Sequence, residues 1–300
     1  MMKRACWLLI LLMLTGSGSA CAESPSTQPM PSIRGIAYTT EQRANPPMHL
    51  HVMVVDLTDP AVHVLVRKAG EVNEAEQEGK WQTKLLRTSD IARRDQLDAA
   101  VNGDFFMSRD VVKTPFKSVP YYIGNRAAVC GIAMTDGQIW STHNAPASLI
   151  VDVKGKVSIA RLKPEKIPAD AKQIISGMNL IVADGKNTGA KADVSPRTAA
   201  GIDRDATRLI LLVVDGRRTE YSAGMNLHDL ADEMIRLGCH QAIQLDGGGS
   251  STMVMHRAGT DDYSIMNRPS DGHDLIFPMS VERAVANVLG VKVDIEKEKK

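Results

Sequence analysis

Short apolar segments with strand-like alternation recur along most of this chain. Residues 49–57 and 62–69 each alternate apolar and polar side chains, and Asp59-Pro60 between them marks a turn. This pattern predicts a hairpin with one buried face. Residues 208–216 are apolar almost without a break, which is typical of a strand buried on both faces. The chain is therefore expected to be rich in strands.

Two further hairpins are expected in the middle of the chain. Residues 128–142 are strand-like on either side of Asp136-Gly137, and residues 148–162 flank Lys154-Gly155 in the same way. Glycine tolerates the positive φ that a tight hairpin turn needs. Both segments therefore predict antiparallel pairs.

The clearest helical pattern begins after Asn226 and ends at Gly238. Asn226 and Asp229 form a pair that resembles a capping box, and a glycine commonly follows the last helical turn. Spacings of three, four, seven and eight residues place the apolar side chains on one face, namely Leu227, Leu230, Ala231, Met234 and Ile235. A second helix is expected over residues 88–97, with Ser89 or Asp90 as its N-cap.

These elements predict an α/β fold of mixed, strand-rich α+β type. We expect a single domain over residues 34–294, with a mixed central sheet and a few flanking helices. The hydrophobic fraction of 43% is sufficient for a buried core, although aromatic residues make up only 4% of the chain. Residues 23–33, rich in Ser, Pro and Thr, are expected to be a flexible tether, and residues 295–300 a charged tail.

Residues 1–22 have the pattern of a signal peptide. Lys3 and Arg4 precede an apolar run at 7–14 that is too short to cross a membrane as a helix. Ala20-Cys21-Ala22 then offers a cleavage site after Ala22. The small residues before Cys21 also suit lipidation of that cysteine, so a cleaved and a lipid-anchored form both stay open. The protein is expected to be periplasmic or secreted, and to meet a membrane only if Cys21 is lipidated.

Charge and spacing argue against several kinds of partner. The formal net charge is +1 and no basic stripe is interleaved with aromatics, so nucleic acid is not expected as a partner. His51, His143, His228, His240 and His256 show no H-x-H or H-x-x-E spacing among themselves, so a metal site built on these histidines is not expected either. Cys130 and Cys239 form a disulfide or remain free thiols, and the sequence does not choose between the two. It also leaves the oligomeric state open.

The segment from Leu245 to Met253 has the most distinctive chemistry. A buried strand ends in Asp246, and three glycines follow, so a substrate or another backbone segment can approach this backbone closely. Ser250, Ser251 and Thr252 then supply hydroxyls that can donate to phosphate or sugar oxygens. The alternative is a tight turn in which Asp246 only accepts hydrogen bonds from local N–H groups.

Residues 102–106 have the same design. A buried strand leads into Asn102-Gly103-Asp104, and Phe105 and Phe106 follow. Asp104 suits either a catalytic acid or base or a turn position. The two phenylalanines are expected to lie in the core, with sugar stacking as the alternative.

Charged residues stand at the ends of other strands too. Arg197 precedes a strand, and a guanidinium fixed there would bind phosphate through two parallel hydrogen bonds. Asp215 and Arg217 follow another strand, and Arg283 precedes the last one. Each motif alone also fits a turn or a surface ion pair. Together they suit a phosphate-bearing sugar, because arginines can hold the anion while carboxylates transfer protons.

These motifs, in this order, resemble the phosphodiester glycosidase family. The resemblance covers roughly residues 95–293. It rests on N-G-D-F-F (102–106), S-P-R-T-A-A-G (195–201), V-D-G-R (214–217), L-G-C (237–239), L-D-G-G-G-S-S-T-M (245–253), N-R-P-S-D (267–271) and E-R-A-V-A-N (282–287). It implies a mixed α/β domain that hydrolyses a sugar-1-phosphodiester, such as an N-acetylglucosamine-1-phosphodiester, in envelope or extracellular glycans.

The resemblance also implies a set of site residues. Asp246, Asp104 and Asp215 are the implied catalytic residues. The implied substrate-binding residues are Asn102, Arg197, Thr198, Arg217, Gly248, Gly249, Ser250, Ser251 and Arg283. We expect Arg197, with Arg217 or Arg283, to bind the phosphodiester, and Asp246 or Asp104 to act as nucleophile or general base.

Two alternatives to this mechanism remain at the level of sequence. Asp104, Asp215 and Asp246 can together supply oxygen ligands to Ca²⁺ or Mg²⁺, which would make the reaction a metal-assisted phosphodiester cleavage. The protein can also be a glycan-binding or exopolysaccharide-assembly protein that does not cut its ligand. One departure bears on activity, because Ser195 stands where members of the family often have a histidine.

Overall fold

The computed structural model describes most of the chain after the signal peptide. The described residues are 33–73, 81–113, 118–144, 147–191, 193–271 and 280–294. The predicted signal peptide, nearly all of the predicted tether and the predicted charged tail lie outside them. These assignments, and the domain bounds of 34–294, stay predictions.

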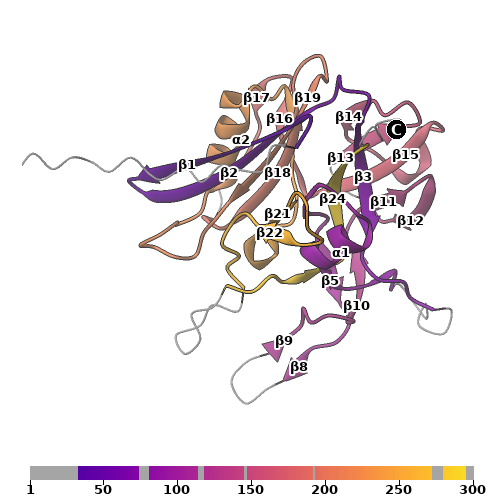
Figure 1. Cartoon of the computed structure of the whole chain (residues 1–300), viewed down its shortest axis with the longest axis horizontal. Helices are drawn as coiled ribbons and strands as arrows, with labels where there is room; N and C mark the ends of the chain where they lie inside the picture. The colour runs from indigo at the N-terminus through magenta and orange to yellow at the C-terminus, as the bar shows by residue number, and fades with distance from the viewer. Residues whose placement is uncertain are drawn as a thin grey trace, which may run out of the picture. The chain divides into compact units, whose positions relative to one another are not determined.

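The largest sheet has seven strands in the order β1-β2-β19-β18-β20-β16-β17 (Figure 1). All of its described pairings are antiparallel. Its strands are β1 (Ile36–Ala44), β2 (Pro47–Asp56), β16 (Asn179–Ala183), β17 (Lys186–Asn187), β18 (Arg197–Ile202), β19 (Arg208–Val214) and β20 (Gln241–Gln244).

Two five-stranded sheets accompany it, in the orders β12-β11-β15-β13-β14 and β22-β21-β6-β24-β3. The first contains β11 (Ile132–Thr135), β12 (Gln138–Thr142), β13 (Ala147–Asp152), β14 (Val157–Ala160) and β15 (Ala171–Gly177). The second contains β3 (Val62–Lys68), β6 (Ala99–Asn102), β21 (Met253–His256), β22 (Tyr263–Ile265) and β24 (Asn287–Val293).

Smaller sheets complete the described strands. They have the orders β4-β10-β7, β23-β5 and β8-β9. Their strands are β4 (Thr83–Lys84), β5 (Leu86–Arg87), β7 (Phe106–Ser108), β8 (Val112–Lys113), β9 (Ser118–Val119), β10 (Arg126–Val129) and β23 (Ala284–Val285).

Two α-helices occur among the described residues, α1 (Thr88–Arg94) and α2 (Leu227–Arg236). Helix α2 confirms the prediction, because Asn226 Oδ1 accepts the Asp229 N–H at 2.9 Å and the predicted apolar face is buried. Helix α1 also occurs in the predicted region, but its N-cap precedes the predicted Ser89 or Asp90. Its N-cap is Arg87, which makes no side-chain capping bond, and the Glu282 carboxylate accepts the Ser89 N–H instead. Short 3₁₀ turns occur at Pro164–Lys166 (η2) and Gly248–Ser250 (η3).

Strand β19 shows how the core is organised. Leu209, Leu211 and Val213 belong to one hydrophobic cluster, shared with strands of both five-stranded sheets. Their neighbours Ile210 and Leu212 point to the opposite face and pack in a second cluster with α2. The prediction that this strand is buried on both faces is therefore confirmed.

The prediction of a central sheet with both parallel and antiparallel strands is wrong. The strand-rich composition with few helices is confirmed, but every described strand pairing is antiparallel. An unbroken apolar strand is typical of parallel sheets because helices cover both of their faces. Here a helix covers one face of β19 and other sheets cover the other, so the same burial arises in an antiparallel sheet.

The predicted hairpin over residues 49–69 is also wrong. Strand β2 pairs with β1 and β19, whereas β3 pairs with β24 in another sheet. The turn at Asp59-Pro60 is present, but the chain uses it to cross between sheets. The hairpins at Asp136-Gly137 and Lys154-Gly155 are confirmed as β11–β12 and β13–β14.

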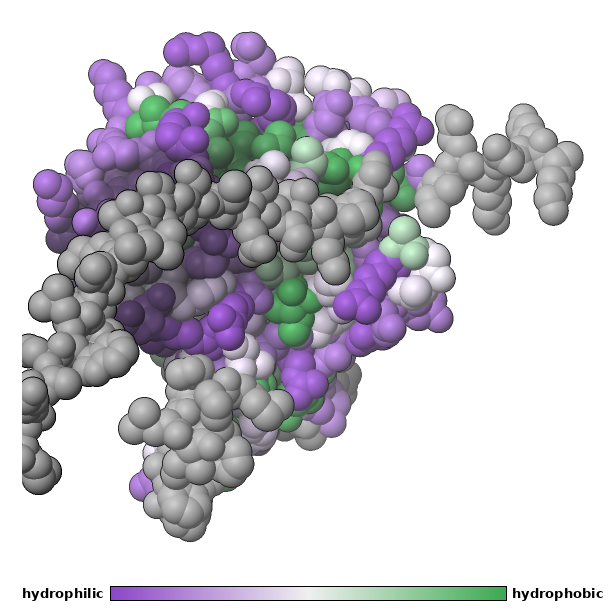
Figure 2. All heavy atoms as spheres, turned by 60° about the vertical axis from the view of Figure 1, so that its left-hand side comes forward, coloured by the Kyte–Doolittle hydropathy of each residue, from purple (hydrophilic) through white to green (hydrophobic). Residues whose placement is uncertain are grey.

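The surface mixes hydrophilic and hydrophobic residues. Figure 2 shows hydrophobic side chains between hydrophilic ones on one face. The large apolar side chains that are exposed include Met107, Val111, Val112 and Ile123. Within the described part of the chain, no helix has the length and apolar character needed to cross a membrane.

Candidate active site

Two strand ends from different sheets meet at the predicted site. Strand β20 leads into Asp246, and β6 leads into Gly103-Asp104. The Asp246 N–H donates to the Gly103 carbonyl oxygen at 2.9 Å, which joins the two strand ends. This contact brings two of the three predicted catalytic carboxylates together.

Asp104 is almost fully buried. Its Oδ1 accepts the Ser176 N–H at 2.9 Å, its Oδ2 accepts from Asn287 Nδ2, and its own N–H donates to Asn287 Oδ1 at 2.8 Å. Burial raises the pKa of Asp104 to about 7 despite the hydrogen bonds from Asn287 and Ser176, and the charge of Asp246 adds to the rise. This carboxyl group therefore retains its proton well above the usual range of aspartic acid.

Asp246 is only partly covered and has cationic neighbours. Its Oδ1 accepts the Gly247 N–H at 2.9 Å. Burial raises the pKa of Asp246 to about 6, while the Ser250 hydroxyl and the charges of Arg283 and Arg217 limit the rise. Asp246 therefore ionises at a lower pH than Asp104.

The glycines after Asp246 let two guanidinium groups lie against the backbone. Gly248 has φ +63°, and a Cβ placed on it would lie 2.8 Å from Arg217 Nη2. A Cβ on Gly249 would lie 2.3 Å from Arg283 Nη2. A Cβ on Gly247 would lie 2.8 Å from the Pro196 carbonyl oxygen, so the predicted approach of another backbone segment is confirmed at Gly247, whereas arginine side chains approach Gly248 and Gly249.

Arg283 is held firmly in this position. Its Nε and Nη2 donate to the Asp271 carboxylate at 3.1 and 3.2 Å, and its guanidinium lies 4.1 Å from the ring centre of Tyr121. Arg217 is exposed, and its guanidinium makes no hydrogen bond or ion pair with any residue that the structure describes. One guanidinium is thus fixed and the other is available to a ligand.

Three consecutive buried hydroxyls follow the glycines. Ser250, Ser251 and Thr252 are at most 1% exposed. Ser250 Oγ is near the Asp246 carboxylate but lacks hydrogen-bond geometry to it, and none of the three hydroxyls has a partner among the described residues. Buried polar atoms are nearly always satisfied in folded proteins, so these three are expected to bind a polar ligand or water.

Asn102, supported by Thr198, binds the backbone on both sides of the glycine segment. Asn102 Nδ2 donates to the Asp246 carbonyl oxygen at 2.6 Å, and its Oδ1 accepts the Thr252 N–H at 3.1 Å and the Thr198 hydroxyl at 2.7 Å. Both side chains are fully buried. They lie beside the site as predicted, but their polar atoms are already occupied by protein partners.

Arg197 donates to the backbone, and its predicted role in substrate binding stays a prediction. It is 9% exposed, its Nε donates to the Met225 carbonyl oxygen at 2.8 Å, and its Nη2 donates to the Asp193 carbonyl oxygen. Burial lowers its pKa and the charge of Arg217 lowers it further, against the raising effect of Asp193. The structure therefore commits most of this guanidinium to binding the backbone.

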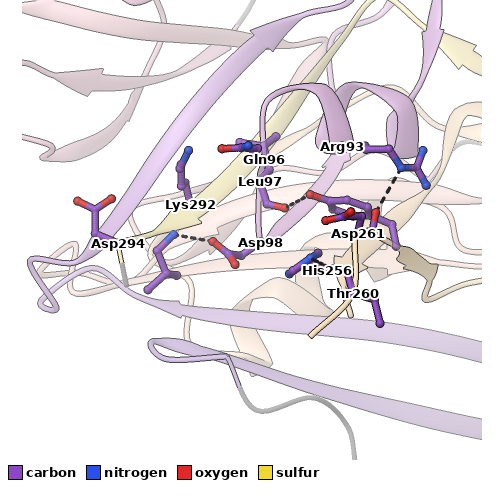
Figure 3. Close-up of a pocket in the computed structure, with 11 residues that line it drawn as sticks. Arg93, Gln96, Leu97, Asp98, His256, Thr260, Asp261, Lys292 and Asp294 are labelled. Carbon is purple, nitrogen blue, oxygen red and sulfur yellow. Dashed lines mark hydrogen bonds between the residues drawn. The ribbon is translucent and has the colours of Figure 1, made fainter. Parts of the chain in front are cut away.

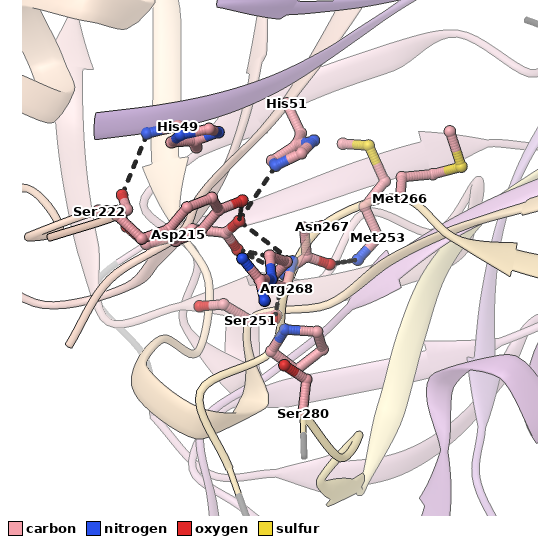
Figure 4. A network of polar contacts seen from close by, with 12 residues as sticks. His49, His51, Asp215, Ser222, Ser251, Met253, Met266, Asn267, Arg268 and Ser280 are labelled. Atoms are coloured by element: carbon pink, nitrogen blue, oxygen red, sulfur yellow. Dashed lines mark hydrogen bonds and ion pairs between the residues drawn. The ribbon is translucent and has the colours of Figure 1, made fainter. Parts of the chain in front are cut away.

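Asp215 lies in a polar network that Asn267 joins to the segment after the glycines, because Asn267 Nδ2 also donates to the Ser251 carbonyl oxygen at 3.0 Å (Figure 4). His51 Nε2 lies 3.2 Å from its Oδ2, the Tyr221 hydroxyl donates to the same oxygen at 2.9 Å, and Asn267 Nδ2 donates to Oδ1 at 2.9 Å. The Arg268 N–H contacts both oxygens. Although burial alone would raise it, the pKa of Asp215 is held below its usual value by these donors.

Several residues near the carboxyl pair were not singled out from the sequence. Asn287, Asp271 and Tyr121 hold Asp104 or Arg283, and the first two belong to the late family motifs quoted above. A cavity of about 10 Å³, large enough for roughly one water molecule, lies beside Asp104 and Cys130. Cys130 and Cys239 are both free thiols. Burial raises the pKa of Cys130, as do the charges of Asp104 and Asp246.

A larger hollow of about 610 Å³ lies at the end of α1, lined by residues that include Arg93, Asp98, His256 and Lys292 (Figure 3). None of the predicted site residues lines it. The Asp98 carboxylate accepts the Val293 N–H at 2.7 Å, and His256 Nε2 lies 2.6 Å from the Thr260 carbonyl oxygen. It offers no pair of catalytic groups comparable with Asp104 and Asp246.

The three aspartates do not gather into the calcium or magnesium site that the sequence offered as an alternative. Among the described residues, the acidic and histidine side chains that gather closely enough to share an ion are His228, Asp229 and Asp232. Asp215 has both oxygens bound by protein donors. The residues present therefore do not fit an ion held jointly by Asp104, Asp215 and Asp246.

Comparison with known proteins supports the motif analysis. The sequence profile of the phosphodiester glycosidase family matches residues 95–292. The N-acetylglucosamine-1-phosphodiester alpha-N-acetylglucosaminidase of Bos taurus is 43% identical over 63 residues, which are 21% of this chain and 11% of the bovine protein. An uncharacterized prophage-derived protein of Bacillus subtilis is 34% identical over 96 residues, which are 32% of this chain and 12% of that protein. The matched segments thus span only about a tenth of these relatives.

The fold has a counterpart among solved structures. The catalytic domain of zebrafish N-acetylglucosamine-1-phosphodiester alpha-N-acetylglucosaminidase, described as auto-inhibited by its pro-peptide, superimposes with a TM-score of 0.63 at 22% identity. The match covers 86% of this chain and 82% of the zebrafish chain. At this identity the likeness concerns the fold alone, whereas the family profile spans well over half of the sequence. The chain therefore belongs to the phosphodiester glycosidase family.

Proposed function

We propose that this protein is an exported hydrolase that cleaves a sugar-1-phosphodiester, of the N-acetylglucosamine-1-phosphodiester kind, in envelope or extracellular glycans. The observation that carries the proposal is the pair Asp104 and Asp246, whose pKa values are raised to about 7 and about 6, beside two guanidinium groups. Membership of the family and the activity named for the bovine relative support it.

The two carboxyl groups have different environments and therefore different roles. Asp246 is near Arg217 and Arg283, which favour its charged form, so it serves as the nucleophile or general base. Asp104 is kept protonated by burial and by the charge of Asp246. It serves as the proton donor, by direct contact or through a water in the adjoining cavity.

Arg217 and Arg283 replace Arg197 as the proposed phosphate ligands. Both lie against the glycine segment, where Ser250, Ser251 and Thr252 offer unpaired hydroxyls. A guanidinium binds phosphate oxygens through parallel charge-assisted hydrogen bonds. Arg197 instead donates to the Met225 and Asp193 carbonyl oxygens.

The test is to incubate the purified protein with a panel of sugar-1-phosphodiesters that includes UDP-N-acetylglucosamine, and to follow release of free sugar. Asp246→Asn is expected to lower kcat by roughly 10²–10⁴-fold, the usual contribution of a positioned acid or base. Arg217→Ala should raise KM and leave the thermal stability unchanged because Arg217 is exposed. Arg197→Ala should instead lower stability.

Silence of the folded wild-type protein across the panel, with glycan binding retained, would favour the glycan-binding alternative. Release by Asp246→Asn at the wild-type rate would remove that residue from the mechanism. Export rests on the pattern of residues 1–22. The mass of the mature N-terminus tests it and shows whether Cys21 carries lipid.

A further inference from the structure

We propose that Asn287 is a positioning residue for the proton donor, because it holds the Asp104 carboxyl group so that its hydrogen is directed to the substrate rather than to the protein. This inference rests on the proposed function, in which Asp104 donates the proton. Asn287 is the first residue of β24 and is fully buried. It acts on the reaction through Asp104 and does not need to contact the substrate.

Three hydrogen bonds join Asn287 to the chain at the proton donor. The Gly103 N–H donates to the Asn287 carbonyl oxygen at 3.0 Å, and the Asp104 N–H donates to Asn287 Oδ1 at 2.8 Å. Asn287 Nδ2 donates to Asp104 Oδ2. A Cβ on Gly103 would lie 2.3 Å from Asn287 Oδ1, so a glycine is required for this close contact. One residue thus fixes both the backbone and the carboxyl group of Asp104.

The orientation of the Asn287 amide follows from its partners. A backbone N–H can only donate, so the amide oxygen faces the Asp104 N–H and the amide nitrogen faces the carboxyl group. The Ser176 N–H, which donates to Asp104 Oδ1 at 2.9 Å, is likewise only a donor. Both of these partners therefore donate to the carboxyl group, and neither can accept a hydrogen from it.

This arrangement decides where the hydrogen of protonated Asp104 can go. It needs an acceptor other than Asn287 and Ser176, such as the substrate or a water in the adjoining cavity. As the bond between the anomeric carbon and the phosphate oxygen breaks, its electron pair stays on that oxygen, and the hydrogen passes from Asp104 to it. The anomeric carbon bonds to Asp246, or to a water that gives its proton to Asp246. The two N–H donors then stabilise the carboxylate left on Asp104.

The same donors set the pH range in which Asp104 keeps its hydrogen. Burial raises the pKa of Asp104 and the charge of Asp246 adds to the rise, whereas the hydrogen bond from Asn287 opposes it. Cys130, after β10, is the titratable side chain that shares the small cavity with Asp104. Loss of the amide donor should therefore raise the pKa of Asp104, so that the hydrogen is retained to higher pH.

The experiment compares the full wild-type chain with Asn287→Leu, which is similar in size but cannot donate. Sugar release is measured between pH 5 and pH 9, and the carboxyl ¹³C signal of Asp104, assigned by its loss in Asp104→Asn, is followed by NMR over the same range. We expect kcat to fall by about 10²-fold, as misplacement of a reacting group does. The alkaline limb of the pH–rate profile and the NMR midpoint should both rise by about one pH unit or more, the effect of losing a hydrogen bond to a charged group.

Two comparisons separate positioning from a general loss of packing. Asn125→Leu makes the same replacement at another buried asparagine, whose side chain bonds to the backbone of Asp110 and Pro120, and should leave the NMR midpoint of Asp104 unchanged. In the wild type, the side-chain NH₂ signals of Asn287 should shift with pH at the same midpoint as the Asp104 carboxyl. This second measurement tests the contact even where Asn287→Leu does not fold.

Three results would overturn the proposal. They are an unchanged NMR midpoint in folded Asn287→Leu, wild-type Asn287 signals that do not follow the titration of Asp104, and a fall in kcat with the alkaline limb left in place. A raised midpoint in Asn287→Leu, with no sugar released by the wild type from any phosphodiester tested, would uphold the effect of Asn287 on Asp104 and count against the proposed function instead.

Discussion

At the scale of single residues, Gly249 determines where Arg283 can lie. A Cβ at this position would come within 2.3 Å of Arg283 Nη2, and the guanidinium cannot retreat freely because Asp271 and Tyr121 hold it. Gly249→Ala is therefore expected to displace Arg283 and to raise KM about tenfold, equivalent to about 1.4 kcal/mol of binding free energy. Steady-state kinetics measure the change in KM, and a thermal melt shows whether the variant is folded.

The Arg283→Lys variant shows whether Gly249→Ala acts through Arg283. Lysine keeps the charge but loses the planar fork, so KM should rise in this variant as well. The double variant should then be less impaired than the two single effects added together, since both remove the same contact. Additive losses would mean that the glycine acts on something other than Arg283.

The sequence predicted the positions of Asp104 and Asp246 at strand ends, but it did not predict which groups the arginines contact. Asp104 and Asp246 follow buried strands, so their place at strand ends is local information and was visible in the sequence. The partners of Arg197 and Arg283 lie elsewhere in the fold, namely the Met225 carbonyl oxygen in one case and Asp271 with Tyr121 in the other. Nothing local distinguishes a guanidinium bound to backbone from one that faces a ligand.

At the scale of elements, Asp215 joins β2 to the segment after β22. It accepts from His51 on β2 and from Asn267 and Arg268 in that segment. Asp215→Asn would set an amide donor against these donors inside the protein, so we expect a loss of about 2–4 kcal/mol in the free energy of unfolding. Urea denaturation at neutral pH measures it.

Asp246→Asn is the matched comparison for this variant. The pKa of Asp246 is raised, so its charged form is unfavourable in the folded protein, and its neutral replacement should not lower stability at neutral pH. Asp215→Asn should therefore lose stability, whereas Asp246→Asn should lose activity. An Asp215→Asn protein as stable as the wild type but inactive would restore the catalytic role predicted from the sequence.

Elements differ in how far the sequence alone determines them. Helix α2 was predicted correctly because its cap, apolar face and final glycine are all local. The two hairpins with glycine turns were correct for the same reason. The predicted pairing of β2 with β3 was wrong, and the two strands belong to different sheets. Alternation of apolar and polar residues shows that a strand has a buried face, but it does not identify the neighbouring strand.

At the scale of the whole molecule, the site depends on contact between sheets. Asp246 follows β20 of the seven-stranded sheet, Asp104 follows β6 of a five-stranded sheet, and Ser176, which donates to Asp104, lies on β15 of the other. One hydrophobic cluster contains residues from all three sheets, including Ile243, Val101 and Ile175. The burial that holds the sheets together also raises the pKa values of the carboxyl pair, so stability and catalysis are linked through pH.

This linkage predicts how stability depends on pH. An aspartate whose pKa rises from 3.8 when unfolded to about 7 when folded binds a proton more tightly in the folded protein. Its contribution to stability is therefore greatest below about pH 4, falls as the pH rises towards about 7, and is constant above that. Over this window, Asp104 is expected to cost the folded state on the order of a few kcal/mol.

Other groups titrate in the same range, and the lowered pKa of His49 acts in the opposite direction. The informative quantity is therefore the difference in free energy of unfolding between wild type and Asp104→Asn, measured by urea denaturation at intervals from pH 4 to pH 8. Asparagine does not titrate, so the wild type should lose stability relative to the variant as the pH rises through this window. A difference that stays constant with pH would show that Asp104 is already ionised at pH 4 and is not the proton donor.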